Sequence, residues 1–184
     1  MESLTTRQMI IISLFTSLTA GLAVVTRLSA GIIPFSLLPM MAMLAGHVLG
    51  ARLGALSMLL YLILGLIGLP VFASPPFGGL TYFFQPSFGF LIGFIFCACI
   101  GGWITSRKAD RLERYLLANL AGIIVINLFG LTHLWFLFNF ILGQQKALGE
   151  ILKIGLFPFL LSDLLKGIIA CFLGFNINKR IKLY

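Results

Sequence analysis

Long apolar segments separated by short connections dominate the chain. The first extends from Met9 to Leu28, about 20 residues, which is the length that an α-helix needs to cross a bilayer. Proline, glycine or charged residues interrupt the later segments at the positions where helices end. The pattern predicts an all-α membrane protein, a bundle of six transmembrane helices, with approximate spans 9–28, 36–50, 53–69, 87–104, 116–142 and 158–176.

Composition supports the same class. The 184 residues are 60% hydrophobic and 10% charged, with a mean hydropathy of +1.09. A chain of this kind cannot present a water-exposed surface as an ordinary globular domain does. We therefore expect one integral domain over residues 1–184, with multi-pass insertion in the plasma membrane.

The formal net charge of +8 does not indicate a nucleic-acid partner, because the basic residues lie at the ends of apolar segments rather than in a stripe. Nine Lys and Arg residues fall on one side of the predicted bundle and three on the other. Since cytoplasmic loops carry the basic excess, both termini are predicted to be cytoplasmic. The 70–86 segment and the start of the last helix then face outside.

The segment from Pro70 to Pro86 contains four prolines and five aromatic residues but no charge. Irregular backbone at membrane depth is tolerated where protein covers it or where it lines a cavity. The segment is therefore predicted to be a lid over a pocket. The alternative is a flat aromatic anchor at the membrane interface.

Asp163 and Lys166 are the acidic and basic residues that lie close together inside an apolar segment. Three-residue spacing places both side chains on one face of a helix. Pro158 favours a helix that begins at that residue, which puts the pair near the outer end. Ionisable groups inside a membrane usually face a cavity and serve a function. The alternative is an ion pair that only joins the two residues to each other.

Small residues recur every four positions on the first predicted helix, in the sets Ser13, Ser17, Gly21 and Thr16, Ala20. Such a ridge allows another helix to approach closely, whether from this chain or from a partner.

Sequence motifs for catalysis are missing. There is no GxxxxGK[ST] phosphate loop, no HExxH and no second intramembrane aspartate. Cys97, Cys99 and Cys171 are odd in number and lack zinc-like spacing, so they are expected to be small core residues. We expect neither an enzyme nor a cofactor or metal.

Three stretches of the chain resemble a known family. They are PFSL at 34–37, LAGHVLGARLGALSMLLYLILGLIGLPVF at 44–72 and LFPFLLSDLLK at 156–166. They are similar to the PxTL, AGxxLGxRLGALSxxxYLxLGxxGLPVF and LxPFxxGDxLK patterns of the biotin-specific (BioY-type) S components of energy-coupling-factor transporters. The resemblance implies a six-helix protein that binds biotin with high affinity from outside. It also implies an integral membrane coupling protein and two cytoplasmic ATPase subunits as partners.

Two stretches depart from the family pattern. The chain has Leu37-Leu38-Pro39 where the family usually has a polar LQT, and QPSFGF at 85–90 where it has GPTGGY. Gln85 is the residue expected to replace a polar contact there.

Biotin has a ureido group with two N–H donors and one carbonyl, an apolar thiophane ring and a carboxylate tail. Asp163 can accept the N–H bonds, while Lys166 can donate to the ureido carbonyl or to the carboxylate. Further candidates follow from the resemblance. Tyr82, Phe84 and Phe35 are expected to cover the ring, and Gln85, Asn127, Arg27 or Lys153 to meet the tail.

The resemblance also assigns the small-residue ridge of the first helix, Ser13, Thr16, Ser17, Ala20 and Gly21, to contact with the coupling protein. Three hypotheses remain open at this point: a biotin-binding S component, an S component or small carrier for another vitamin, and an intramembrane enzyme or structural subunit.

Overall fold

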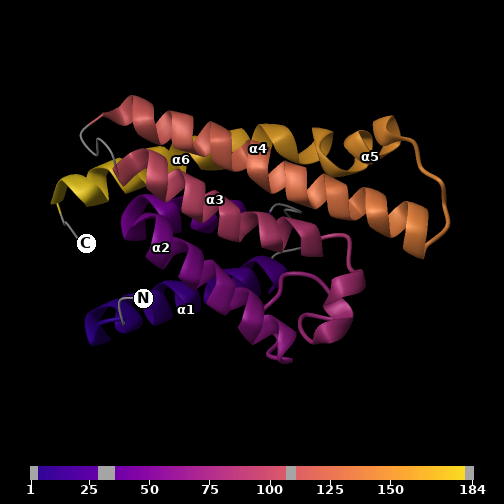
Figure 1. Ribbon diagram of the computed structural model, residues 1–184, viewed down its shortest axis with the longest axis horizontal. Coiled ribbons are helices and arrows are strands. Elements are labelled where there is room, and N and C mark those ends of the chain that lie inside the picture. Colours follow the sequence, from indigo (N-terminus) through magenta and orange to yellow (C-terminus); the bar gives the residue numbers. More distant parts are fainter. Residues whose placement is uncertain (1–3, 29–35, 107–110, 181–184) are drawn as a thin grey trace.

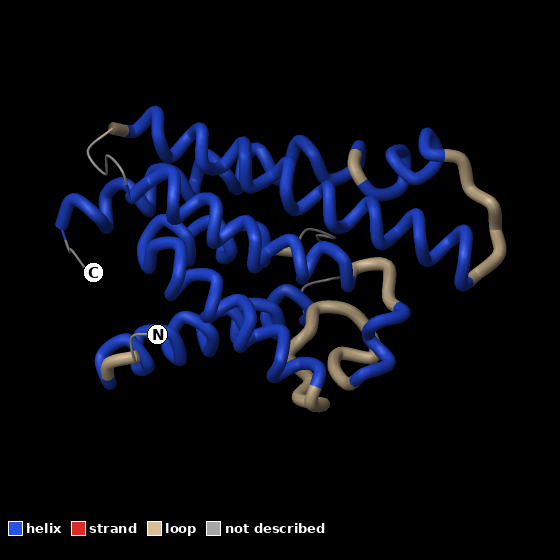
Figure 2. The backbone as a smooth tube through the Cα atoms, in the orientation of Figure 1, coloured by secondary structure: helices blue, strands red, loops and turns tan. Residues whose placement is uncertain are grey.

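The computed structural model describes residues 4–28, 36–106 and 111–180, and within these ranges it contains helices and loops without a strand (Figures 1 and 2). Its elements are α1 (Thr6–Leu28), α2 (Leu38–Leu66), the 3-10 helix η1 (Leu80–Phe84), α3 (Phe88–Ser106), α4 (Leu112–Phe136), the π-helix η2 (Leu137–Ile141), α5 (Leu148–Gly155) and α6 (Phe157–Arg180). The prediction of an all-helical fold is confirmed for these residues.

Five helical segments of the described chain are long and apolar enough to cross a membrane: Thr6–Arg27, Leu38–Leu66, Phe88–Ser106, Leu112–Ile141 and Phe157–Arg180. Many large apolar side chains on their surfaces are exposed, as Ile10, Leu14 and Leu18 on α1 illustrate. In water such a surface would be costly, whereas in a bilayer it meets lipid chains.

The α2 helix covers most of the predicted spans 36–50 and 53–69, and it is interrupted at Gly50, where φ is 77° and ψ is 178°. Glycine is the residue that adopts this conformation without strain. A Cβ atom on Gly54 would lie 2.7 Å from the carbonyl oxygen of Ala45. In a straight helix these residues would be about 13 Å apart along the axis. The chain therefore reverses direction at Gly50, and the two halves of α2 pack against each other.

Some helix bounds differ from those expected. The second half of α2 ends at Leu66 rather than at residue 69, because Gly68 has a φ of 106° and cannot continue the helix. The α6 helix begins at Phe157, beside the predicted start at Pro158, and continues to Arg180, beyond the predicted end at residue 176. Asn178 on this extension donates hydrogen bonds to the His47 carbonyl and the Tyr115 hydroxyl, which anchor the last turns.

The connection after the fifth predicted span also contains structure. The predicted spans 116–142 and 158–176 leave a connection between them, and this connection includes the short helix α5 (Leu148–Gly155). Ile151 and Gly155 of α5 are buried while Lys153 is exposed. The helix is amphipathic and only 8 residues long, so it does not produce the long apolar run from which a membrane helix is predicted.

The middle of the bundle is formed by α3, which packs closely on α2 and α4. A Cβ atom on Gly102 would lie 2.3 Å from the backbone nitrogen of Ala51, and one on Gly93 would lie 2.8 Å from the Cα atom of Ile126. Small residues thus let these backbones touch, as is common between membrane helices. Along one side, α1 joins α2 through a 3.0 Å hydrogen bond from Thr16 Oγ1 to the Ser57 carbonyl.

The two ends of the bundle differ. At one end, Leu4 and Ile11 from the start of the chain and Ile177 near the end of α6 pack on the same small apolar cluster. This is the end at the left of Figure 1, where α1 begins and α6 finishes. The opposite end carries α5 and the 67–87 segment, and the candidate site lies towards it.

Candidate functional site

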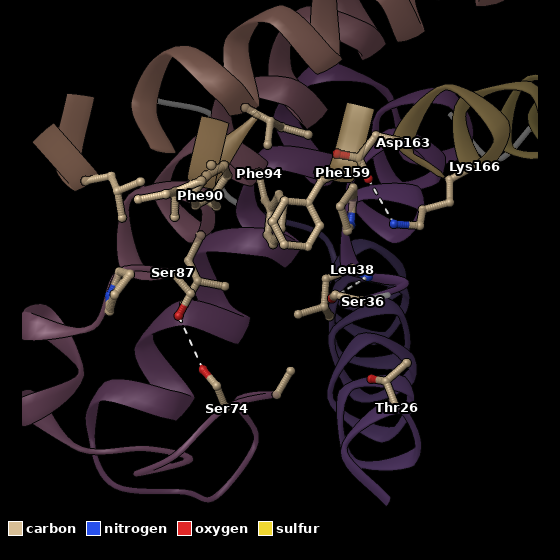
Figure 3. Close-up of a pocket in the computed structure, with 18 of the residues that line it drawn as sticks. Thr26, Ser36, Leu38, Ser74, Ser87, Phe90, Phe94, Phe159, Asp163 and Lys166 are labelled. Atoms are coloured by element: carbon tan, nitrogen blue, oxygen red, sulfur yellow. Dashed lines mark hydrogen bonds and ion pairs between the residues drawn. The ribbon is translucent and has the colours of Figure 1, made fainter. Parts of the chain in front are cut away.

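A cavity of about 470 Å³ lies between the helices at the end that carries α5. This volume is in the range of pockets that hold small organic molecules, about 300–1,000 Å³. Residues from α1 to α6 and from the 67–87 segment line the cavity, so its shape depends on the packing of the whole bundle. Figure 3 shows the side chains that point into it.

Asp163 and Lys166 of α6 both line the cavity, and among the described lining residues they are the charged ones. Lys166 Nζ lies 2.9 Å from Asp163 Oδ1, and each residue is 7% exposed. Lys166 also donates to Ser162 Oγ at 3.3 Å. The start of α6 beside Pro158 places the pair in the first turns of the helix (Figure 3). The cavity thus contains a carboxylate that accepts and an ammonium that donates hydrogen bonds.

A cluster of three hydroxyl groups forms a second polar region of the wall. Ser74 Oγ lies 2.6 Å from Tyr82 Oη and 3.3 Å from Ser87 Oγ, and Tyr82 Oη lies 2.9 Å from Ser87 Oγ. All three residues line the cavity. We call them the hydroxyl cluster. Tyr82 was expected at the site, whereas Ser74 and Ser87 were not; the signal in the sequence is that the two serines directly flank the proline-bounded stretch 75–86.

Between these polar regions the wall is largely apolar. Phe90 and Phe94 project from α3, Phe159 from α6, and Leu38 and Ile126 from α2 and α4. In Figure 3, Phe159 lies next to Asp163, whereas Phe90 lies towards Ser87. An apolar wall with a few polar groups is the usual composition of a small-molecule pocket, in which the polar groups set orientation.

The 67–87 segment forms part of the wall instead of extending into solvent. Its Phe72 side chain is 0% exposed, and its Tyr82 side chain is 2% exposed. The Phe72 ring contacts Tyr61 and Tyr82, and the Val71 carbonyl accepts a 3.0 Å hydrogen bond from Tyr61 Oη. The other face of the segment is exposed, including Phe83 at 43%. The segment therefore has a buried face over the cavity and an apolar outer face.

Other residues predicted for the site lie elsewhere. Gln85 is not a lining residue, and its backbone carbonyl lies 3.2 Å from His133 Nε2. Phe84 is 62% exposed on the outer face of η1. Asn127 is buried, but it does not line the cavity, and its Nδ2 donates to the Ile123 carbonyl of its own helix. Phe35 lies outside the described residues.

The two basic residues considered for a ligand tail do not line the cavity either. The Arg27 guanidinium lies 4.5 Å from the centre of the Phe77 ring and donates to the Pro70 carbonyl at 3.3 Å, so it joins α1 to the 67–87 segment. Lys153 is exposed on α5.

The small residues of α1 separate into two faces. Ser13, Ser17 and Gly21 are exposed, and nothing lies within 4 Å of a Cβ atom built on Gly21. Thr16 is 1% exposed and is hydrogen-bonded to Ser57 of α2. Ala20 is partly buried and packs against the core. The exposed set, which we call the α1 strip, is the part that a partner can reach.

Comparison with known proteins finds a family model and several biotin transporters that are similar to this chain. The model of the BioY family matches residues 1–183. A biotin transporter BioY of Rhizobium etli is 34% identical over 93% of this chain and 92% of its own length. A probable biotin transporter BioY of Lysinibacillus sphaericus is 31% identical over 95% of this chain and 88% of its own length.

A solved structure shares the fold. It is the S-component for biotin from an ECF-type ABC transporter, and it superposes with a TM-score of 0.74 over 98% of this chain and 97% of its own. The two chains are 24% identical, so the likeness concerns the arrangement of the helices.

Proposed function

The chain belongs to the BioY family, and from this premise we propose that it is the biotin-binding subunit of a membrane uptake transporter. The observation that carries the proposal is the cavity, whose charged lining among the described residues consists of Asp163 and Lys166. A transported molecule with its own donors and acceptors is recognised by such a pair, and biotin has both in its ureido ring. The protein therefore acts as a binding component and not as an enzyme.

The ureido ring fits the ion pair by its hydrogen-bonding groups. Asp163 accepts bonds from the ureido N–H groups, and Lys166 donates to the ureido carbonyl. Lys166 Nζ and Asp163 Oδ1 are 2.9 Å apart, so each buried charge has a partner of opposite sign within the protein. Phe90, Phe94 and Phe159 enclose the thiophane ring, which has no strong hydrogen-bonding groups.

The carboxylate of biotin needs hydrogen-bond donors, and we assign it to the hydroxyl cluster. Of the earlier candidates for this role, Gln85, Asn127, Arg27 and Lys153 do not line the cavity, and Lys166, which does, is assigned here to the ureido carbonyl. Ser74, Tyr82 and Ser87 do line it, and each hydroxyl can turn its hydrogen from a neighbouring oxygen to a carboxylate. Tyr82 therefore contacts the tail in this proposal, as well as packing on Phe72.

The assignment predicts a selective effect of Ser87→Ala. A hydrogen bond to a charged group contributes about 1.5–3 kcal/mol, so the affinity for biotin is expected to fall about tenfold or more. The affinity for biotinamide, whose tail is uncharged, is expected to fall less. Calorimetric titration of the purified variant with both ligands measures the two changes.

The matched control is Ser106→Ala, which removes an exposed hydroxyl at the far end of α3, the helix that begins directly after Ser87; this hydroxyl donates to the Trp103 carbonyl. It should leave both affinities unchanged. Equal losses for biotin and biotinamide, or no loss for either, would place the carboxylate elsewhere.

We also propose the membrane orientation. The reversal at Gly50 supports counting the two halves of α2 as separate spans, six in all, and the nine Lys and Arg residues predicted on the side of the termini favour a cytoplasmic location for that side. The cavity then opens towards the outside.

A cysteine introduced at exposed Gln144 should react with a membrane-impermeant thiol reagent in intact cells. Reaction only after cell lysis would show that the protein has the opposite orientation.

The partners follow from the family. We propose that the chain docks on an integral coupling protein that works with two cytoplasmic ATPase subunits, and that the α1 strip is part of the contact. Its three residues are small and exposed, which suits close approach of a second helix.

Mass spectrometry tests the proposed substrate. Protein purified from cells grown with biotin should release biotin on denaturation, in amounts that approach one molecule per chain. Release of a different vitamin, with no biotin, would assign the cavity to another substrate.

A further inference from the structure

A buried polar cluster connects α2, α4 and α6 outside the cavity. His47 on α2 is 0% exposed and Asn119 on α4 is 4% exposed, and neither lines the cavity. His47 Nε2 lies 2.7 Å from Asn119 Oδ1, and Asn119 Nδ2 donates to the backbone carbonyl of Gly167 on α6. Gly167 directly follows Lys166, so the cluster meets α6 at the depth of the ion pair.

The hydrogen positions in this cluster follow from its geometry. Because the amide nitrogen of Asn119 donates to Gly167, the amide oxygen faces His47 and must accept. His47 Nε2 therefore carries the hydrogen. His47 Nδ1 is left as a buried acceptor with no hydrogen-bond partner among the described residues. A buried unsatisfied acceptor costs stability, so stability alone is a poor reason for a histidine and an asparagine here.

Contacts along α6 show what the cluster fixes. A Cβ atom on Gly167 would lie 3.6 Å from the Cβ atom of Asn119, so the amide sits directly against the helix backbone. Seven residues later, a Cβ atom on Gly174 would lie 2.7 Å from the Cβ atom of His47. Asn119 and His47, which are hydrogen-bonded to each other, thus contact α6 at two points about 10 Å apart along its axis.

Two fixed points on one face determine both the rotation and the depth of a helix. Successive side chains on a helix are about 100° apart, so a rotation of α6 by about one residue would turn Asp163 and Lys166 away from the cavity. We propose that Asn119, oriented by His47, is a positioning residue for Lys166 and Asp163. Its role rests on the proposed function of that pair in biotin binding.

The test compares two asparagines that both hold α6. Asn119→Leu removes the bond at Gly167, beside the ion pair. Asn178→Leu removes bonds to the His47 carbonyl and Tyr115, about 18 Å further along the helix from Lys166. Both changes are expected to lower the thermal stability of the purified protein. Asn119→Leu alone should lower biotin affinity about tenfold, while Asn178→Leu should leave it within about twofold.

A second readout does not require biotin. With Lys166→Cys as background, the rate at which a small water-soluble thiol reagent modifies position 166 reports whether that side chain faces the cavity; peptide mass spectrometry separates it from the native cysteines. Adding Asn119→Leu should slow modification several-fold, and adding Asn178→Leu should not.

The outcomes separate the two proposals. Equal effects of Asn119→Leu and Asn178→Leu on affinity and labelling, or no effect of either, would overturn the positioning role. If the wild-type protein bound no biotin, the proposed function would fail, and the labelling rates alone would decide whether Asn119 positions α6.

Discussion

Asp163→Asn is expected to weaken biotin binding by about tenfold or more, because hydrogen bonds to a charged group contribute about 1.5–3 kcal/mol. The carboxylate of Asp163 can accept two ureido N–H bonds, whereas an amide has one oxygen acceptor and an N–H₂ group that opposes the ureido donors. The substitution also removes the negative charge that lies 2.9 Å from the buried ammonium group of Lys166. Calorimetric titration of the detergent-purified variant with biotin measures the loss.

The matched control is Glu150→Gln. Glu150 is an exposed carboxylate on α5, at the same end of the bundle, and it does not line the cavity. The substitution changes the net charge by the same amount, so a general electrostatic effect on biotin would appear in both variants. We expect the control to bind biotin as the wild type does. Unchanged affinity in folded Asp163→Asn protein would remove Asp163 from the site.

Because breaking a buried ion pair can cost about 3–5 kcal/mol of stability, the single variant must be compared with a double one. Asp163→Asn combined with Lys166→Met removes both charges and should recover part of the lost thermal stability. Its biotin affinity should remain low if the pair binds the ureido group. A stable double variant with wild-type affinity would mean that Asp163 and Lys166 serve only each other.

Gly21→Leu is expected to abolish biotin uptake in cells that contain the coupling protein and the ATPase subunits, while biotin binding by the purified protein stays unchanged. A side chain at position 21 has open space around it, since nothing lies within 4 Å of a Cβ atom built there. The added isobutyl group would therefore project from the α1 strip into the space that a docking helix would occupy. Loss of close approach between two helices is the physical cause.

Gly149→Leu provides the control for adding the same side chain to an exposed helical glycine. Gly149 lies on α5, where a Cβ atom also meets nothing within 4 Å. This variant should keep both binding and uptake. If Gly21→Leu lowered biotin affinity, position 21 would belong to the internal packing of the bundle. Normal uptake by the variant would show that the coupling protein docks on another surface.

The sequence predicted the features that depend on composition and local spacing. Apolar segments of membrane length identified the long helices, and the ring of Pro158 placed the start of α6 within one residue. The three-residue spacing of Asp163 and Lys166 placed both on one helix face, where the structure brings them to one cavity. These signals are local because a helix relates positions three or four residues apart in a fixed way.

Features that depend on contacts between distant segments could not be predicted in this way. The predicted spans 36–50 and 53–69 imply a turn between them, but only the structure shows that the turn falls at Gly50, where φ is 77°. Likewise, the sequence does not show which face of α1 packs on α2. It therefore could not distinguish Thr16, which is buried, from Ser17, which is exposed. Ser74 and Ser87 are 13 positions apart, and the segment between them contains turns and the short helix η1, so their hydrogen bond has no regular spacing in the sequence.

His47 and Asn119 illustrate the same limit. They are 72 residues apart in the chain, and each is an ordinary polar residue within an apolar segment. Their position next to Gly167 follows only from the packing of α2, α4 and α6. Polar residues in membrane helices usually bond to neighbouring helices, but the sequence does not identify the partner.

The most direct test of the central claim is an equilibrium binding measurement with radiolabelled biotin on the purified full chain in lipid nanodiscs. We predict saturable binding of one biotin per chain, displaced by unlabelled biotin and greatly reduced by Asp163→Asn. Folded protein that bound no biotin, or that bound it equally well with and without the Asp163 carboxylate, would contradict the account.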